Sequence, residues 1–244
     1  MFFSGKKIPL VCFMFFALAL SAHGEIVRWI SPEPQWTFKT GVTFETDKNL
    51  HLDSVPVDFS AAFSLSQFQC SVGMQFQPSV FDFSTYFIYS PTFFNHLNVG
   101  VKSLFHTKHF TAEYLELDLL VGLYAMYRLN RYLAFDSDFM FHLKLSKIYS
   151  IEDSMPWIKN NSFAFRFEAF CNPVQRLTLG LGVSSYSMYR YNLFFSPDYW
   201  ISAEYKFVDF VSVGTKALIE YIDMYTLSAN RRLCDFTVYV KLEI

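Results

Sequence analysis

The sequence predicts an all-β protein that closes into one antiparallel transmembrane β-barrel of about twelve strands. Three observations support this fold class. Apolar and polar residues alternate along most of the chain, the apolar faces carry no charge, and no apolar run after residue 24 approaches the length of a spanning helix. A helix needs about 20 apolar residues to cross a bilayer, whereas a tilted strand needs only about 9–11. The 30 Phe and 15 Tyr residues also favour strands.

The first 24 residues have the features of a secretory signal peptide. Lys6 and Lys7 precede an apolar run from Ile8 to Leu20, and the small residues Ala22 and Gly24 follow it. This order is typical of a cleaved signal, and the run is short for a spanning helix, although an uncleaved anchor is the alternative. We therefore predict a signal peptide at 1–24, a short periplasmic segment at 25–34, and a barrel over 35–244.

Alternation with a period of two is clearest in the middle of the chain. Leu115, Leu117 and Leu119 alternate there with Glu116 and Asp118. Successive side chains of a strand point to opposite faces of the sheet, so each such segment has one apolar face and one polar face. Stretch 66–112 has the weakest pattern, which leaves ten strands as the alternative count. The predicted strands lie near 36–45, 57–65, 69–76, 81–87, 97–102, 115–125, 133–145, 162–169, 177–184, 199–207, 211–221 and 235–244.

The uncharged apolar faces indicate which side of the sheet meets the surroundings. A membrane barrel turns apolar residues to lipid and polar residues to its lumen. A soluble β-sandwich, the alternative, would bury the apolar faces against each other. The signal peptide and the number of long strands favour the membrane barrel. In lipid every backbone N–H and C=O must be bonded internally, which requires a closed sheet.

The links between the predicted strands differ in length at the two rims. Short links follow the second, sixth, eighth and tenth strands, and longer ones follow the first, seventh, ninth and eleventh. Outer-membrane barrels have short periplasmic turns and longer external loops. The longest predicted loop is 146–161, in which Tyr149, Met155 and Trp157 are the candidate contacts for an external ligand.

One hairpin allows a prediction of register. Pairing Leu129 with Leu133 across a short turn keeps both apolar faces outward. That register places Asp118 opposite Lys144 inside the barrel and predicts a cross-strand charge pair there.

The polar faces predict a lumen of mixed charge. Rings of charge on a pore wall select ions by sign, but opposite charges can also pair and fill a narrow interior, so both an open pore and a salt-bridged plug are possible. Inward-facing glycines favour some open volume. The predicted lumen residues are Lys39, Glu45, Asp58, Lys102, Glu116, Asp118, Asp136, Asp138, His142, Lys144, Arg166, Glu168, Glu204, Lys216, Glu220 and Lys241.

Nothing in the sequence predicts catalysis, a metal site or a cofactor. We expect His106 and His109 to be solvated loop residues, and His142 to be part of a polar lining. Cys70 and Cys171, with Cys234, are expected to be small apolar-face residues rather than a disulfide framework. A formal net charge of −2, without a basic cluster, argues against nucleic acid as a partner.

The signal peptide, the alternating strands, the long loops on one side and the apolar last strand, 236–244, together resemble small bacterial outer-membrane β-barrel proteins. The resemblance implies the cell outer membrane as location, outer-membrane lipid as surroundings and insertion by the barrel-assembly machinery. The last strand departs from the usual pattern by ending in Ile244 instead of an aromatic residue, and the Phe- and Tyr-rich composition favours a spirochaete. Two functions follow: a narrow passive channel for small polar or ionic solutes, or a non-conducting structural or adhesin-like barrel that binds an extracellular ligand through its loops.

Overall fold

The computed structural model describes residues 33–47, 49–78, 80–94, 96–110, 114–130, 132–148, 157–187, 197–221 and 231–244. The predicted signal peptide at 1–24, most of the segment at 25–34, and the loop candidates Tyr149 and Met155 lie outside these residues. No helix in the described ranges is long and apolar enough to cross a membrane.

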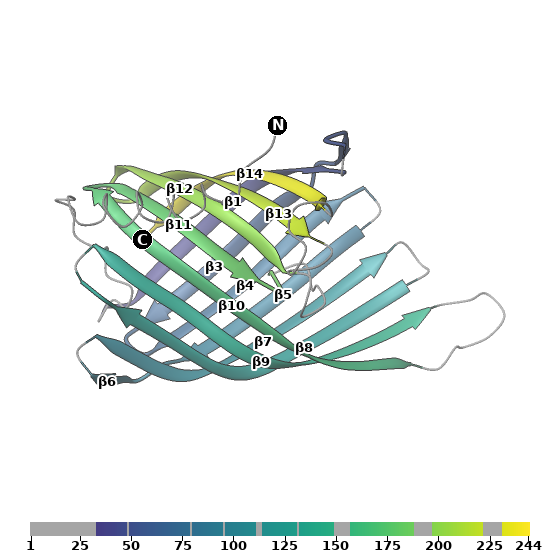
Figure 1. Ribbon diagram of the computed structural model, residues 1–244, viewed down its shortest axis with the longest axis horizontal. Helices are drawn as coiled ribbons and strands as arrows, with labels where there is room; N and C mark the ends of the chain where they lie inside the picture. The colour runs from purple at the N-terminus through teal and green to yellow at the C-terminus, as the bar shows by residue number, and fades with distance from the viewer. Residues whose placement is uncertain are drawn as a thin grey trace, which may run out of the picture.

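The chain forms one antiparallel sheet that wraps around a single interior (Figure 1). Each long strand pairs with the next long strand, and β14 pairs with β1, which confirms a closed barrel of twelve strands and excludes both the sandwich and the count of ten. Two short strands, β2 (Leu52–Ser54) and β6 (Thr92–Phe94), flank it. The long strands are β1 (Gln35–Thr46), β3 (Val57–Leu65), β4 (Phe68–Gln77), β5 (Val80–Tyr89), β7 (Leu97–Phe110), β8 (Tyr114–Arg128), β9 (Leu133–Ile148), β10 (Ile158–Val174), β11 (Leu177–Ser184), β12 (Asp198–Val208), β13 (Val211–Tyr221) and β14 (Arg231–Glu243).

The seam between the first and last strands is as continuous as the other pairings. Its register runs from Thr37 opposite Glu243 to Thr46 opposite Cys234. At the end of the seam, Trp36 and Ile244 exchange two backbone hydrogen bonds of 2.8 Å. Closure leaves no open strand edge, which is the condition for a sheet to survive in lipid.

The two faces of the sheet have the predicted orientation. Leu123 is 65% exposed on the outer surface, whereas Asp82 and Asp118 are 0% exposed on the inner one. Apolar residues outside and charges inside invert the arrangement of a soluble barrel, and they match a wall with lipid on one side and polar contents on the other. The three described cysteines are free thiols.

The two rims differ in their links. At the rim that holds both chain ends, here called the terminal rim, the links are 66–67, 90–96, 129–132, 175–176 and 209–210. At the opposite rim, called the loop rim, they are 47–56, 78–79, 111–113, 149–157, 185–197 and 222–230. The longer links predicted after the first, seventh, ninth and eleventh strands are confirmed, and all four lie at the loop rim.

Two predictions near the loop rim were wrong. The link after β9 is 149–157 and not 146–161, because Ile158 still pairs with Ser146, so 185–197 is the longer link. His106 and His109 lie on β7 and not in a loop. In both cases the strand continues through polar residues. Alternation of apolar and polar residues is absent there, so it does not predict that part of the strand.

Candidate functional site: the barrel interior

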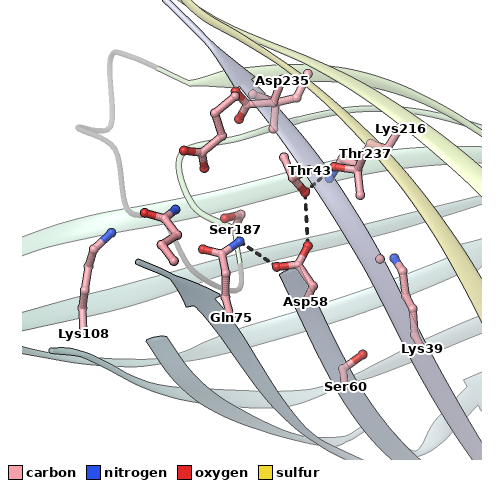
Figure 2. A pocket seen from close by; sticks show the side chains of 14 residues that line it. Lys39, Thr43, Asp58, Ser60, Gln75, Lys108, Ser187, Lys216, Asp235 and Thr237 are labelled. Carbon is pink, nitrogen blue, oxygen red and sulfur yellow. Dashed lines mark hydrogen bonds between the residues drawn. The ribbon is translucent and has the colours of Figure 1, made fainter. Parts of the chain in front are cut away.

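Three cavities run in series through the interior. The first, of about 330 Å³, opens towards the loop rim and is lined by Glu45, Asp58 and Asp235 (Figure 2). It shares Lys39 and Lys216 with a central cavity of about 390 Å³. The third, of about 370 Å³, lies at the terminal rim, and it shares Tyr86, Phe170 and Glu204, among others, with the central one. Because each cavity shares lining residues with the next, the series extends from one rim to the other.

The predicted lumen residues divide into two sets according to these cavities. Six of them line none of the three cavities: Glu116, Asp118, Asp138, His142, Lys144 and Glu220. Ten of them line one or more: Lys39, Glu45, Asp58, Lys102, Asp136, Arg166, Glu168, Glu204, Lys216 and Lys241.

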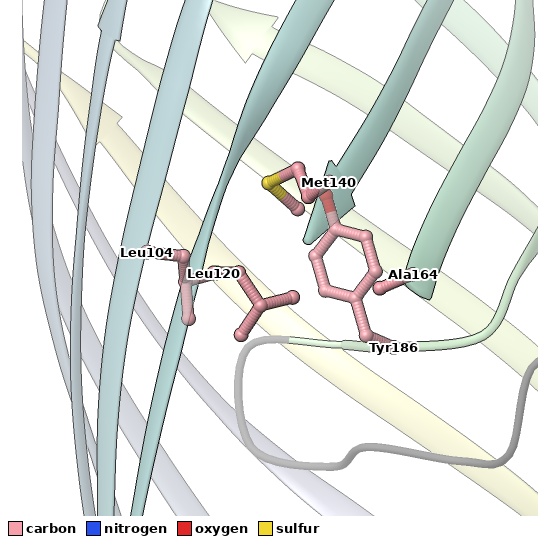
Figure 3. Close-up of a cluster of buried hydrophobic side chains, with 5 residues drawn as sticks. All are labelled: Leu104, Leu120, Met140, Ala164 and Tyr186. Carbon is pink, nitrogen blue, oxygen red and sulfur yellow. The ribbon is translucent and has the colours of Figure 1, made fainter. Parts of the chain in front are cut away.

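An apolar cluster inside the barrel was not predicted. Leu104, Leu120, Met140 and Ala164 occupy inward positions of β7 to β10 and are at most 3% exposed. Tyr186, from the link after β11, reaches inward and packs its ring on this cluster (Figure 3). The sequence signal is a row of apolar residues at polar-face positions, and it becomes visible only when the register of four strands is known.

Hydrogen bonds hold Tyr186 in this position. The Nζ of Lys102 donates to Asp138 Oδ2 at 2.7 Å and to the Tyr186 hydroxyl at 2.8 Å. The same hydroxyl donates to Asp138 Oδ2 at 2.6 Å. The backbone N–H of Ser185 also donates to the carbonyl of Phe165 on β10 at 3.0 Å. Tyr186 and the apolar cluster therefore fill the side of the interior formed by β7 to β10.

A row of polar side chains crosses the same wall, one layer nearer the loop rim. His106 Nε2 lies 2.9 Å from Asp82 Oδ1, and His106 Nδ1 lies 3.1 Å from Asp118 Oδ2. His142 Nε2 lies 2.6 Å from Asp118 Oδ1, and its Nδ1 lies 3.0 Å from Ser162 Oγ. Each ring nitrogen of His106 therefore lies within hydrogen-bond distance of a carboxylate oxygen. The row ties together β5, β7, β8, β9 and β10.

The hairpin register is confirmed, but the charge pair drawn from it is not. Asp118 does lie opposite Lys144, and Leu129 donates its N–H to the carbonyl of Leu133 at 3.0 Å. Lys144 instead pairs with Glu116 at 2.7 Å, while His106 and His142 make hydrogen bonds to Asp118. Long side chains in a sheet can contact diagonal neighbours, so register alone does not determine ion pairs.

The other charges of the interior are also largely satisfied within the wall. Arg166 pairs with Glu168, and Lys241 pairs with Glu204. Asp58 accepts hydrogen bonds from Gln75 at 2.7 Å and from Thr43 at 3.1 Å (Figure 2). No group of His, Cys, Asp and Glu in the described part of the chain could hold a metal ion.

The sequence indicated that the inward glycines leave open space. The structure shows aromatic rings against two of them. A Cβ on Gly182 would lie 2.2 Å from the ring of Trp200, and one on Gly214 would lie 2.2 Å from the ring of Tyr239. These glycines are slots for inward aromatic rings.

Trp157, the described candidate for loop contacts, directly precedes β10 at the loop rim, is 45% exposed, and has Lys147 Nζ 5.9 Å from its ring centroid.

Comparison with known proteins identifies the fold alone. No family model and no curated protein sequence matches the chain. Among solved structures, the NanC porin has a TM-score of 0.63 at 10% identity, over 84% of this chain and 98% of that one. The KdgM porin has a TM-score of 0.56 at 10% identity, with the same coverage. The chain therefore has the fold of the outer-membrane porins, a closed twelve-stranded antiparallel β-barrel.

Proposed function

We propose that this protein is an outer-membrane channel through which small polar or ionic solutes pass passively. The observation that carries the proposal is the series of three cavities that share lining residues from one rim to the other. Tyr186 and Leu104 of its apolar cluster line the central cavity, so the filled side of the interior borders the path but leaves a polar lining on the rest of the wall.

The size and lining of the path limit the solutes. Each cavity measures about 330 to 390 Å³, near the lower end of the roughly 300–1,000 Å³ of small-molecule pockets. The lining includes carboxylates, ammonium groups and hydroxyls, which favours hydrated polar solutes over apolar ones. A structure of the KdgM porin is a complex with disordered oligogalacturonate, so a protein of this fold can form a complex with a polar solute.

The proposal includes the surroundings of the barrel. Export by the signal peptide at 1–24, insertion by the barrel-assembly machinery and contact of the apolar outer face with outer-membrane lipid follow from the sequence pattern. No enzymatic role is proposed, because the interior histidines His106 and His142 are engaged with Asp82 and Asp118 in the wall.

The alternative function is a non-conducting barrel that binds an extracellular ligand through its loop rim. Two observations favour it: Tyr186 and its cluster fill part of the interior, and Trp157 is exposed at the loop rim. Electrical recording from the refolded protein in a planar bilayer separates the two functions. Discrete current steps support the channel. A barrel that is folded by circular dichroism yet passes no current supports the surface-binding protein.

A further inference from the structure

The same arrangement of side chains occurs twice, side by side, on the lumen wall. Trp200 of β12 lies opposite Gly182 of β11, and Tyr239 of β14 lies opposite Gly214 of β13. A Cβ at either glycine would lie 2.2 Å from the facing ring, closer than any real contact. Both rings are thus laid over a neighbouring strand at positions where only glycine leaves room.

Each ring is also fixed at its polar end by a carboxylate two strands away. Trp200 donates its Nε1–H to Glu168 at 3.3 Å, and Tyr239 donates its hydroxyl to Glu204 at 3.0 Å. Each carboxylate has its own cation, because Arg166 pairs with Glu168 and Lys241 pairs with Glu204. The two carboxylates are therefore already neutralised by cations other than the lysines described next.

A lysine lies over each ring. Lys216 Nζ is 4.4 Å from the ring centroid of Trp200, and Lys39 Nζ is 3.6 Å from that of Tyr239. The register repeats as well. Each lysine lies on the strand that follows, around the barrel, the one carrying the aromatic residue, and it pairs with the residue two positions after that aromatic residue. A cation over an aromatic face is held by electrostatic attraction to the ring, which leaves N–H donors of the ammonium group available.

These two ammonium groups differ from the other cations of the lumen. Within the ranges that the structure describes, neither has a carboxylate at ion-pair distance or a hydrogen-bond acceptor, whereas Lys102, Arg166, Lys206 and Lys241 all do. Lys39 and Lys216 both line the first and the central cavity. They therefore present available donors where those two cavities join.

We infer that Lys39 and Lys216 are two successive binding stations for oxyanions, so that the solutes of the channel include small carboxylates or phosphates. An ammonium group held over an aromatic ring is a positioned point charge, which binds a carboxylate or phosphate oxygen through charge-assisted hydrogen bonds. Two stations in one path allow an anion to be bound at the first and then passed to the second. The inference rests on the proposed channel function and names its solute class.

Titration calorimetry of the refolded barrel in detergent, with inorganic phosphate and separately with acetate, tests the stations without requiring conduction. The wild type is expected to bind one or both anions saturably, and the anion that binds identifies the class. Lys39→Met or Lys216→Met should weaken binding about tenfold, since each removes one charge-assisted hydrogen bond, and the double variant should abolish it. Lys159→Met, which removes an exposed positive charge on β10, is the matched control and should bind like the wild type.

The outcomes separate this inference from the proposed function. Circular dichroism of each variant first establishes that the barrel is folded. No binding of either anion by the wild type, or equal binding by the folded double variant, would overturn the stations even if the barrel conducts. Lysine-dependent binding by a barrel that passes no current would support the stations while contradicting the channel. Conduction together with lysine-dependent binding supports both.

Discussion

Replacing His106 by alanine is expected to destabilise the barrel by about 3 kcal/mol. The imidazole is 0% exposed and lies between Asp82 at 2.9 Å and Asp118 at 3.1 Å. A hydrogen bond to a charged group contributes about 1.5–3 kcal/mol, so the loss of two gives roughly 3–6 kcal/mol. Each carboxylate keeps one cationic or polar neighbour, Lys108 at 3.7 Å from Asp82 and His142 at 2.6 Å from Asp118, which places the expected loss at the lower end.

The same strand provides the control. His109 follows three residues later on β7 and is exposed, so His109→Ala should change the free energy of unfolding by no more than about 0.5 kcal/mol. The assay is equilibrium unfolding in urea of barrels refolded in lipid vesicles, followed by tryptophan fluorescence. If the two alanine variants unfold within about 0.5 kcal/mol of each other, the polar row does not stabilise the wall and the reasoning is refuted.

Three further changes test other parts of the barrel. Tyr186→Ala removes a ring from the filled side of the interior and should raise the single-channel conductance, whereas Tyr205→Ala, on the outer surface, should leave it unchanged. Gly122→Ala places a methyl carbon 2.1 Å from the carbonyl oxygen of Phe139 and should lower the folded fraction on heat-modifiability gels far more than Gly41→Ala, where the nearest atoms are 3.0 Å away. In link 47–56, the backbone N–H of His51, and after it that of Asn49, holds the pKa of Asp47 below its usual value. The ionised carboxylate therefore stabilises this turn above the unfolded-state pKa, and the effect is lost as the pH falls through the lower folded-state pKa. Amide exchange at His51, corrected for its intrinsic rate, should accelerate in acid, and Asp47→Asn should remove that pH dependence; an unchanged profile would contradict it.

The sequence predicted the strands and their orientation well because both depend on a local pattern. Alternation such as Leu115, Glu116, Leu117 and Asp118 reports directly which side chains meet lipid. The pattern fails where a strand passes beyond the apolar band. Thr107, Lys108 and His109 are all polar, so the two faces of the strand do not differ there and the end of β7 was predicted to be a loop.

The interior was less predictable because its contacts join distant strands. That His106 joins Asp82 to Asp118 depends on the register of three strands, because Asp118 lies directly opposite His106 whereas Asp82 is a diagonal neighbour. The position of Tyr186 depends on the path of a link, which periodicity does not describe. The sequence predicted inward-facing glycines, but the role of Gly182 and Gly214 as slots for Trp200 and Tyr239 requires the register of β11 to β14.

The measurement that tests the channel most directly is chemical modification of one lumen residue during current recording. Ser60 lines the first cavity, whereas the next residue, Ala61, lines none of the three interior cavities and borders a groove on the outer face. Each would be replaced by cysteine in a chain whose cysteines, Cys70, Cys171 and Cys234 among them, have been replaced by serine or alanine. A water-soluble cationic thiol reagent should lower the single-channel current in steps for Ser60→Cys and leave it unchanged for Ala61→Cys. A folded Ser60→Cys barrel that passes no current, or whose current the reagent does not alter, would contradict a continuous aqueous path through the lumen.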